Sequence, residues 1–214
     1  MSVVTGWQFS GPVCLAREAT ARLFGPLFSF YLRGPRVEGA KHLDAINGPT
    51  LICPTHASHF DSSALRLALG PRHRRRLAPA VAADYFSASR LRWFLAAWLG
   101  SFLFERGARG KRASVEMARD LLAAGWHVLV FPEGTRSMTG EIGPFRPGAA
   151  FIAIESGVPI LPVRIRGTAA VLPKGASVPH RAPVTVTFGP LLWPEPGEDA
   201  RQLTARLEAA VRSL

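Results

Sequence analysis

The chain has 214 residues, of which 48% are hydrophobic and 19% are charged, and its formal net charge is +11. This length favours one domain with a substantial core, and two cysteines are too few for a disulfide scaffold. The positive charge favours an anionic partner, namely a membrane surface, a phosphorylated substrate or nucleic acid. The low cysteine content fits a reducing, cytoplasmic setting.

Residues 10–32 are predicted to be helical, with a break at Gly25 and the proline that follows it. Large apolar side chains are interspersed here with Arg17, Arg22 and Arg33. Two interpretations stay open: an interfacial amphipathic helix pair that meets anionic lipid, or an ordinary helix packed on the core. No apolar run in the chain reaches the roughly 20 residues of a membrane span. No signal peptide is expected, because the first basic residue is Arg17.

Strand-like and helix-like stretches alternate along the rest of the chain. This pattern predicts an α/β fold, a mainly parallel or mixed sheet flanked by helices. We expect a single domain over residues 1–214, with an N-terminal helical segment (1–35) and an α/β core (36–214). Strands are predicted at residues 36–38, 50–54, 78–82, 102–104, 127–131, 158–165 and 184–188, and helices at 62–69, 87–99, 111–124 and 198–213.

A basic run, Arg-His-Arg-Arg-Arg, occupies residues 72–76 directly after the helix-ending pair Gly70 and Pro71. Such a run is usually a solvated loop, although it could also bind phosphate. We favour the solvated loop.

Residues 55–61, Thr-His-Ala-Ser-His-Phe-Asp, bring a base, hydroxyls and a carboxylate into one short stretch. On one strand His56 and Asp61 would point to opposite faces, and on one helix they would lie about 140° apart. A strand end, a tight turn and a helix start would instead fold Asp61 back onto the imidazole. A carboxylate at Nδ1 leaves Nε2 as a base, and the missing nucleophile of a Ser-His-Asp arrangement could be a substrate hydroxyl.

A second polar stretch, Phe-Pro-Glu-Gly-Thr-Arg-Ser, occupies residues 131–137 after a predicted strand. Gly134 permits a turn in which backbone amides can converge on an anion, and Arg136 adds a guanidinium suited to phosphate. Glu133 would repel phosphate, so we expect it to position an arginine or to accept from a substrate hydroxyl. Arg146 adds a positive charge before an apolar helix. The alternative is a surface turn with a salt bridge.

Four sequence blocks resemble the glycerolipid acyltransferase family, of the lysophosphatidic acid acyltransferase type, in order and in spacing. The resemblance covers roughly residues 36–190. Two positions depart from the usual pattern: Thr55 stands where the family has Asn, and Glu105 where Asp is more usual. The blocks are His-x4-Asp at 56–61, Gly-Ser-Phe-Leu-Phe-Glu-Arg at 100–106, Phe-Pro-Glu-Gly-Thr-Arg-Ser at 131–137 and Val-Pro-Ile-Leu-Pro-Val at 158–163.

The resemblance implies acyl transfer from acyl-CoA or acyl-carrier protein to a lysophospholipid hydroxyl. The expected acceptor is 1-acylglycerol-3-phosphate, giving phosphatidic acid, and a lyso-aminolipid or glycerol-3-phosphate stays open as an alternative. In this reaction His56 acts as the general base and Asp61 orients it, without a metal or cofactor. Apolar residues 93–98 would line an acyl tunnel. The acceptor's phosphate and glycerol would be held by Arg106, Glu133, Gly134, Thr135 and Arg136.

Two other classes were weighed against this interpretation. A metal-dependent hydrolase could use His56, His59 and Asp61, but the remaining histidines form no ligand motif. A non-catalytic basic module could bind a membrane or nucleic acid, but no nucleic-acid-binding motif is present. We therefore expect an enzyme at the cytoplasmic face of a membrane, peripheral or monotopic. Its expected partners are a lysophospholipid, an acyl donor and anionic lipid, without nucleic acid.

Overall fold

The computed structural model describes most of the chain, and all the predicted strands are present in it. The helix predicted at 87–99, and with it the proposed acyl tunnel, falls mostly outside the described residues. The described residues are 6–82, 94, 97–104, 108–137, 139–173, 176 and 178–214. The strands are β1 (Arg36–Glu38), β2 (Leu51–Pro54), β3 (Leu77–Ala82), β4 (Phe102–Phe104), β5 (His127–Leu129), β6 (Ile160–Arg166) and β7 (Thr185–Phe188). The helices are α1 (Gly11–Tyr31), α2 (Lys41–Asp44), α3 (Asp61–Arg74), α6 (Ala108–Ala123), α7 (Gly148–Ser156), α8 (Thr168–Val171) and α9 (Ala200–Ser213), after the 3-10 turn η1 (Trp7–Phe9).

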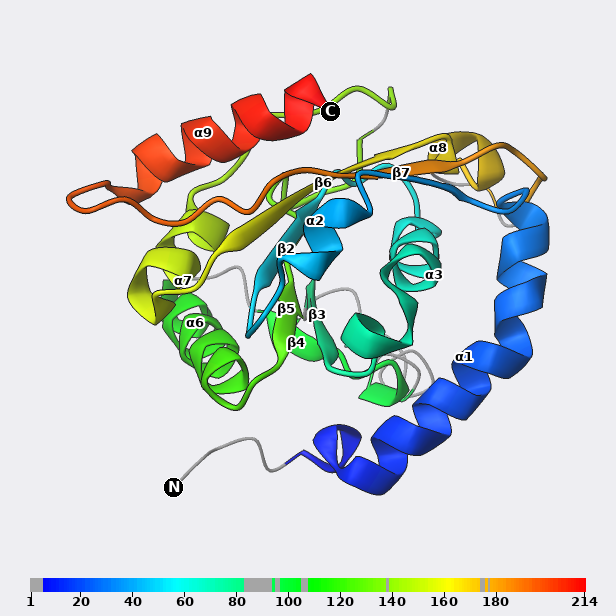
Figure 1. Ribbon diagram of the computed structural model, residues 1–214, viewed down its shortest axis with the longest axis horizontal. Coiled ribbons are helices and arrows are strands. Elements are labelled where there is room, and N and C mark those ends of the chain that lie inside the picture. The colour runs from blue at the N-terminus through cyan, green and yellow to red at the C-terminus, as the bar shows by residue number, and fades with distance from the viewer. Residues whose placement is uncertain are drawn as a thin grey trace.

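The strands form one seven-stranded sheet in the order β1-β7-β6-β2-β5-β3-β4 (Figure 1). Strands β6, β2, β5, β3 and β4 are parallel, whereas β7 pairs antiparallel with β6 and parallel with β1. The predicted α/β class with a mixed, mainly parallel sheet is therefore confirmed. The division into 1–35 and 36–214 stays a prediction.

Helices cover both faces of the sheet, and the central strand β2 is buried on both (Figure 1). Leu51 and Cys53 of β2 belong to the core shared with α6, α7 and α9. Ile52 points the other way, into the core shared with Leu65 and Leu69 of α3. A strand buried on both faces must be apolar at every position, which is why this stretch reads as a continuous apolar run.

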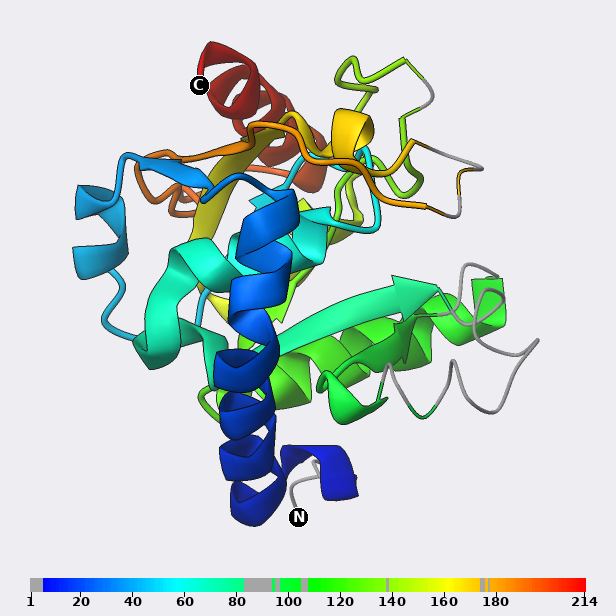
Figure 2. The ribbon, with the colours of Figure 1, turned by 90° about the vertical axis from the view of Figure 1, so that its right-hand side faces the viewer.

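The break predicted at Gly25 is wrong, because α1 runs without interruption through Pro26 (Figure 2). A proline inside a helix removes one hydrogen bond and its ring clashes with the carbonyl four residues earlier, and contacts on both sides of Pro26 offset this cost by holding α1 to the domain. Before it, the Glu18 carboxylate accepts a hydrogen bond from Arg74 of α3 at 2.6 Å. After it, Leu32 is fully buried. No described helix combines the length and the apolar character that crossing a bilayer requires.

The basic run at 72–76 is only partly the solvated loop that its composition predicts. Gly70 has a left-handed φ of 66° and interrupts α3, as expected, but the chain then resumes a helical turn. His73 is buried, and Arg74 is bound to Glu18, which is itself 6% exposed. The long arginine stem allows one residue of the run to reach a buried carboxylate on α1, while Arg72, Arg75 and Arg76 stay in solvent.

Candidate active site

The polar residues of the site follow three neighbouring parallel strands, at the edge where each strand ends. His56 comes after β2, the 131–137 loop comes after β5, and Thr168 comes after β6. In the sheet, β2 lies between β5 and β6, so the three segments meet at its carboxyl edge. This edge is where ligands bind in open α/β sheets.

His56 and Asp61 form the hydrogen-bonded pair that the sequence predicts. His56 Nδ1 lies 2.8 Å from Asp61 Oδ2. The pair forms because β2 ends at Pro54, a turn follows, and α3 begins at Asp61. The Asp61 side chain is completely buried, whereas the His56 side chain remains 19% exposed. With Nδ1 facing the carboxylate, Nε2 is the ring nitrogen left to accept a proton.

Asp61 is fixed by hydrogen bonds to both of its carboxylate oxygens. Oδ2 accepts from the backbone N–H groups of Ala57 at 2.7 Å and Ser58 at 2.8 Å, as well as from His56. Oδ1 accepts from the hydroxyl of Thr168, which is 0% exposed. Sequence reasoning missed Thr168, although it is the first polar residue after β6 at the same sheet edge. These donors hold the orientation of the Asp61 carboxylate.

The 131–137 loop holds His56 from the other side. The Phe131 ring stacks on the imidazole with the two centroids 3.8 Å apart and the planes 19° apart. The backbone N–H of Ser137 donates to the His56 carbonyl at 2.8 Å, and the N–H of His56 donates to Glu133 Oε1 at 2.8 Å. The imidazole is therefore positioned by two loops that lie far apart in the sequence.

Glu133 is buried, and backbone N–H groups donate to both of its carboxylate oxygens. Its second oxygen, Oε2, accepts from the N–H of Gly143 at 2.9 Å. Burial raises the pKa of Glu133, and the hydrogen bonds from Gly143 and His56 oppose this rise. Among the described residues no arginine forms an ion pair with Glu133, so the expected arginine partner is absent from that part of the chain. A direct contact with substrate stays a prediction.

Two arginines, Arg136 and Arg146, belong to the region of the Gly134 turn. Gly134 has a left-handed φ of 72°, as its turn requires, but its N–H donates to the carbonyl three residues earlier at 3.0 Å. This amide therefore donates within the turn, and binding of an anion by the amides of the turn stays a prediction. A Cβ on Gly134 would lie 3.0 Å from Nε of Arg146, so that arginine packs against the turn. Arg136 is half-buried and Thr135 exposed, whereas Arg106 lies outside the described residues.

Ser58 and Cys53, two nucleophilic residues close to His56 in the sequence, are not available for covalent catalysis. Ser58 is fully buried, and its hydroxyl donates to the carbonyl of Leu172 at 2.9 Å. Cys53 lies within β2, and burial raises the pKa of its thiol far above the ordinary value, which suppresses the reactive thiolate. Within the described residues, no three His, Cys, Asp or Glu side chains are grouped to hold a metal ion.

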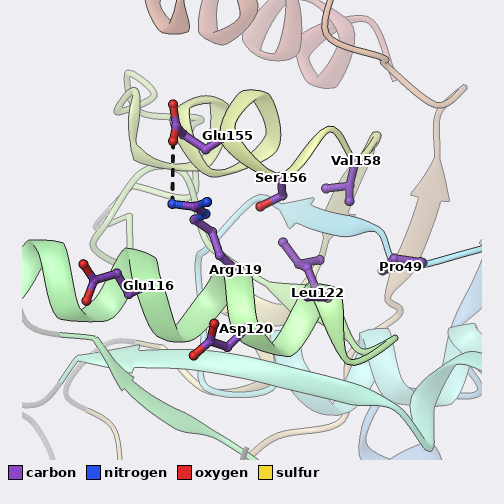
Figure 3. Close-up of a pocket in the computed structure, with 9 residues that line it drawn as sticks. Pro49, Glu116, Arg119, Asp120, Leu122, Glu155, Ser156 and Val158 are labelled. Atoms are coloured by element: carbon purple, nitrogen blue, oxygen red, sulfur yellow. Dashed lines mark ion pairs between the residues drawn. The ribbon is translucent and has the colours of Figure 1, made fainter. Parts of the chain in front are cut away.

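A separate cavity of about 510 Å³ lies between α6 and α7 (Figure 3). Arg119 and Glu155 face each other there, with Nη1 and Oε2 3.7 Å apart. Pro49 and Val158, which also line it, precede β2 and β6. The cavity is therefore at the amino edge of the sheet, at the opposite end of β2 from His56.

Comparison with known proteins agrees with this architecture. A family model described as Acyltransferase matches residues 34–166, which is more than half of the chain. The chain belongs to the acyltransferase family.

Two curated relatives and one solved structure are similar to the chain. The 1-acyl-sn-glycerol-3-phosphate acyltransferase BAT2 of Brassica napus is 27% identical over 73% of this chain and 44% of its own length. The 1-acyl-sn-glycerol-3-phosphate acyltransferase alpha of Mus musculus is 35% identical over 64% of this chain and 47% of its own length. The chain thus spans less than half the length of either relative. The crystal structure of the 1-acyl-sn-glycerophosphate acyltransferase PlsC from Thermotoga maritima shares the fold, with a TM-score of 0.69, 23% identity, and coverage of 95% of this chain and 86% of that one.

Proposed function

We propose that the chain transfers an acyl group from an acyl thioester, acyl-CoA or acyl-carrier protein, to the free hydroxyl of 1-acylglycerol-3-phosphate, giving phosphatidic acid. The observation that carries the proposal is the His56–Asp61 pair at 2.8 Å, beside Ser58 and Cys53, which are both 0% exposed. A base beside two buried nucleophilic side chains suits a reaction in which the substrate brings the attacking hydroxyl. The names of the relatives support the choice of acceptor.

In the proposed mechanism, His56 Nε2 takes the proton of the acceptor hydroxyl as its oxygen attacks the thioester carbonyl carbon. Asp61 stabilises the imidazolium that forms, because its carboxylate lies 2.8 Å from Nδ1. The tetrahedral intermediate collapses as the C–S bond breaks, and the imidazolium returns the proton to the departing thiolate. The ester and the free thiol are the products, and His56 is restored to its neutral form.

We propose that arginines around the Gly134 turn hold the phosphate of the acceptor. Arg136 lies on the loop that contacts His56 through Phe131 and Ser137, and Arg146 packs against Gly134. A guanidinium can bind two phosphate oxygens at once, which fixes the distance between the phosphate and the reacting hydroxyl. Arg106 keeps the phosphate-binding role that the resemblance implies.

The proposal is tested by thiol release from one acyl-CoA with a panel of lysolipids, with the lipid product identified by mass spectrometry. Arg136→Ala is expected to raise the KM for the phosphorylated acceptor about 10- to 100-fold, since it removes charge-assisted hydrogen bonds. The matched control is Arg75→Ala, an exposed arginine just beyond the far end of α3. No acyl transfer to any lysolipid would contradict the proposed function, and an unchanged KM in Arg136→Ala would move the phosphate site elsewhere.

We also propose that α1 holds the chain on the cytoplasmic face of an anionic membrane. Leu23, Leu27 and Phe30 of α1 are 74%, 52% and 51% exposed, and Arg22 and Arg33 stand beside them in solvent. An exposed apolar stripe with flanking arginines is suited to the boundary between acyl chains and headgroups. Burying one leucine contributes about 1.5–3 kcal/mol, so Leu23→Asp with Leu27→Asp should weaken vesicle binding at least 100-fold. Co-sedimentation with phosphatidylglycerol vesicles measures this, and unchanged binding would exclude this surface.

A further inference from the structure

We infer that Glu133 is a positioning residue for His56, an inference that rests on the proposed function. Oε1 of Glu133 accepts the backbone N–H of His56 at 2.8 Å, and Oε2 accepts the N–H of Gly143 at 2.9 Å. The side chain is 6% exposed. Its carboxylate is thus directed at protein amides, whereas a ligand of the acceptor would present an oxygen to solvent or substrate.

The two hydrogen bonds join three separate segments of the chain. They link the turn after β2, the loop after β5 and the approach to α7. The last segment is anchored in turn, because the N–H of Arg146 donates to the carbonyl of Pro132 at 2.9 Å. A Cβ on Gly143 would lie 3.2 Å from Oε2, so the absence of a side chain there allows the close approach. Glu133 therefore sets where the backbone of His56 lies relative to the arginine-bearing turn.

Glu133 also acts on His56 through its charge. The carboxylate interacts electrostatically with both His56 and Asp61. When His56 takes the proton of the acceptor hydroxyl, the imidazolium that forms interacts with both carboxylates at a half-buried site, where charge interactions are stronger than in water. Both effects act on the transition state, so they affect kcat more than binding of the acceptor.

Three variants at one position separate this role from a direct contact with substrate. In Glu133→Gln the amide keeps the shape and one acceptor, but its NH2 group faces an N–H donor, so one of the two hydrogen bonds is lost together with the charge. Glu133→Ala loses both hydrogen bonds. Glu133→Asp keeps the charge but is one methylene shorter, so it cannot span both amides. Glu141→Gln is the matched control, an exposed glutamate in the same connection before α7.

Steady-state kinetics give the first measurement, with acceptor and acyl-CoA varied separately. We expect Glu133→Gln to lower kcat about 10- to 100-fold with an unchanged KM for the acceptor, because a misplaced base slows the chemical step. Glu133→Asp should recover part of this loss, and Glu141→Gln should match the wild type. A raised acceptor KM with an unchanged kcat would overturn the inference and make Glu133 a substrate ligand.

The second measurement does not depend on activity. In amide NMR spectra of the full chain, Glu133→Gln should shift the backbone N–H signals of His56 and Gly143, which donate to it. The signals of Ala57 and Ser58 should shift less, because their N–H groups donate to Asp61. Unchanged His56 and Gly143 signals would overturn the inference. A wild-type chain without acyl transfer would contradict the proposed function alone, since the spectra still decide the role of Glu133.

Discussion

Replacing His56 with alanine is expected to lower kcat for acyl transfer by about 10² to 10⁴, the usual contribution of a general base. The side chain supplies Nε2, and neither Ser58 nor Cys53 can replace it, since both are fully buried. The fold should survive, because the imidazole lies at the sheet edge and is 19% exposed. Thiol release with 1-acylglycerol-3-phosphate as acceptor measures the loss.

The controls for His56→Ala must distinguish the loss of the general base from unfolding of the protein. His42→Ala removes an imidazole from α2 and should retain wild-type kcat. Circular dichroism and thermal unfolding of His56→Ala should match the wild type, and the acceptor should still bind. If His56→Ala transfers acyl groups at the wild-type rate, the general-base proposal is wrong.

Asp61→Asn is expected to lower kcat on the order of 10² to 10³, the size found when stabilisation of a developing charge is removed. Three donors, from His56, Ala57 and Ser58, converge on Oδ2. These donors would hold the side-chain oxygen of an asparagine at the position of Oδ2. His56 would therefore keep the tautomer with its proton on Nδ1. The hydroxyl of Thr168 can rotate to accept from the new NH2 group. The expected loss therefore reflects the missing negative charge beside the imidazolium.

A double substitution and a milder variant test this interpretation of the role of Asp61. The variant with both His56→Ala and Asp61→Asn should be no slower than His56→Ala alone, because the carboxylate acts only through the base. Thr168→Val removes one hydrogen bond to Asp61 and should cost about tenfold. Single-turnover kinetics separate the chemical step from product release. Full activity in Asp61→Asn would show that the pair is structural.

Local sequence predicted most elements of the fold because each depends on neighbouring residues. The apolar run at β2 and the periodic apolar positions of α6 are set by burial and helical geometry over a few residues. At α9 the side chain of Asp199 caps the helix, with Gln202 completing a capping box. Where a distant contact overrides the local signal the prediction failed, as at Gly25, where packing on both sides keeps α1 continuous.

The sequence alone predicted that His56 and Asp61 form a pair after a strand. They lie five residues apart, and a turn between them brings the two side chains together. The tertiary structure alone decided what holds that pair. Thr168 lies 107 residues from Asp61, and Glu133 lies 77 residues from His56. Their contacts exist because β6 and β5 flank β2. Strand order is set by packing of the whole sheet, and the periodicity of any one segment does not encode it.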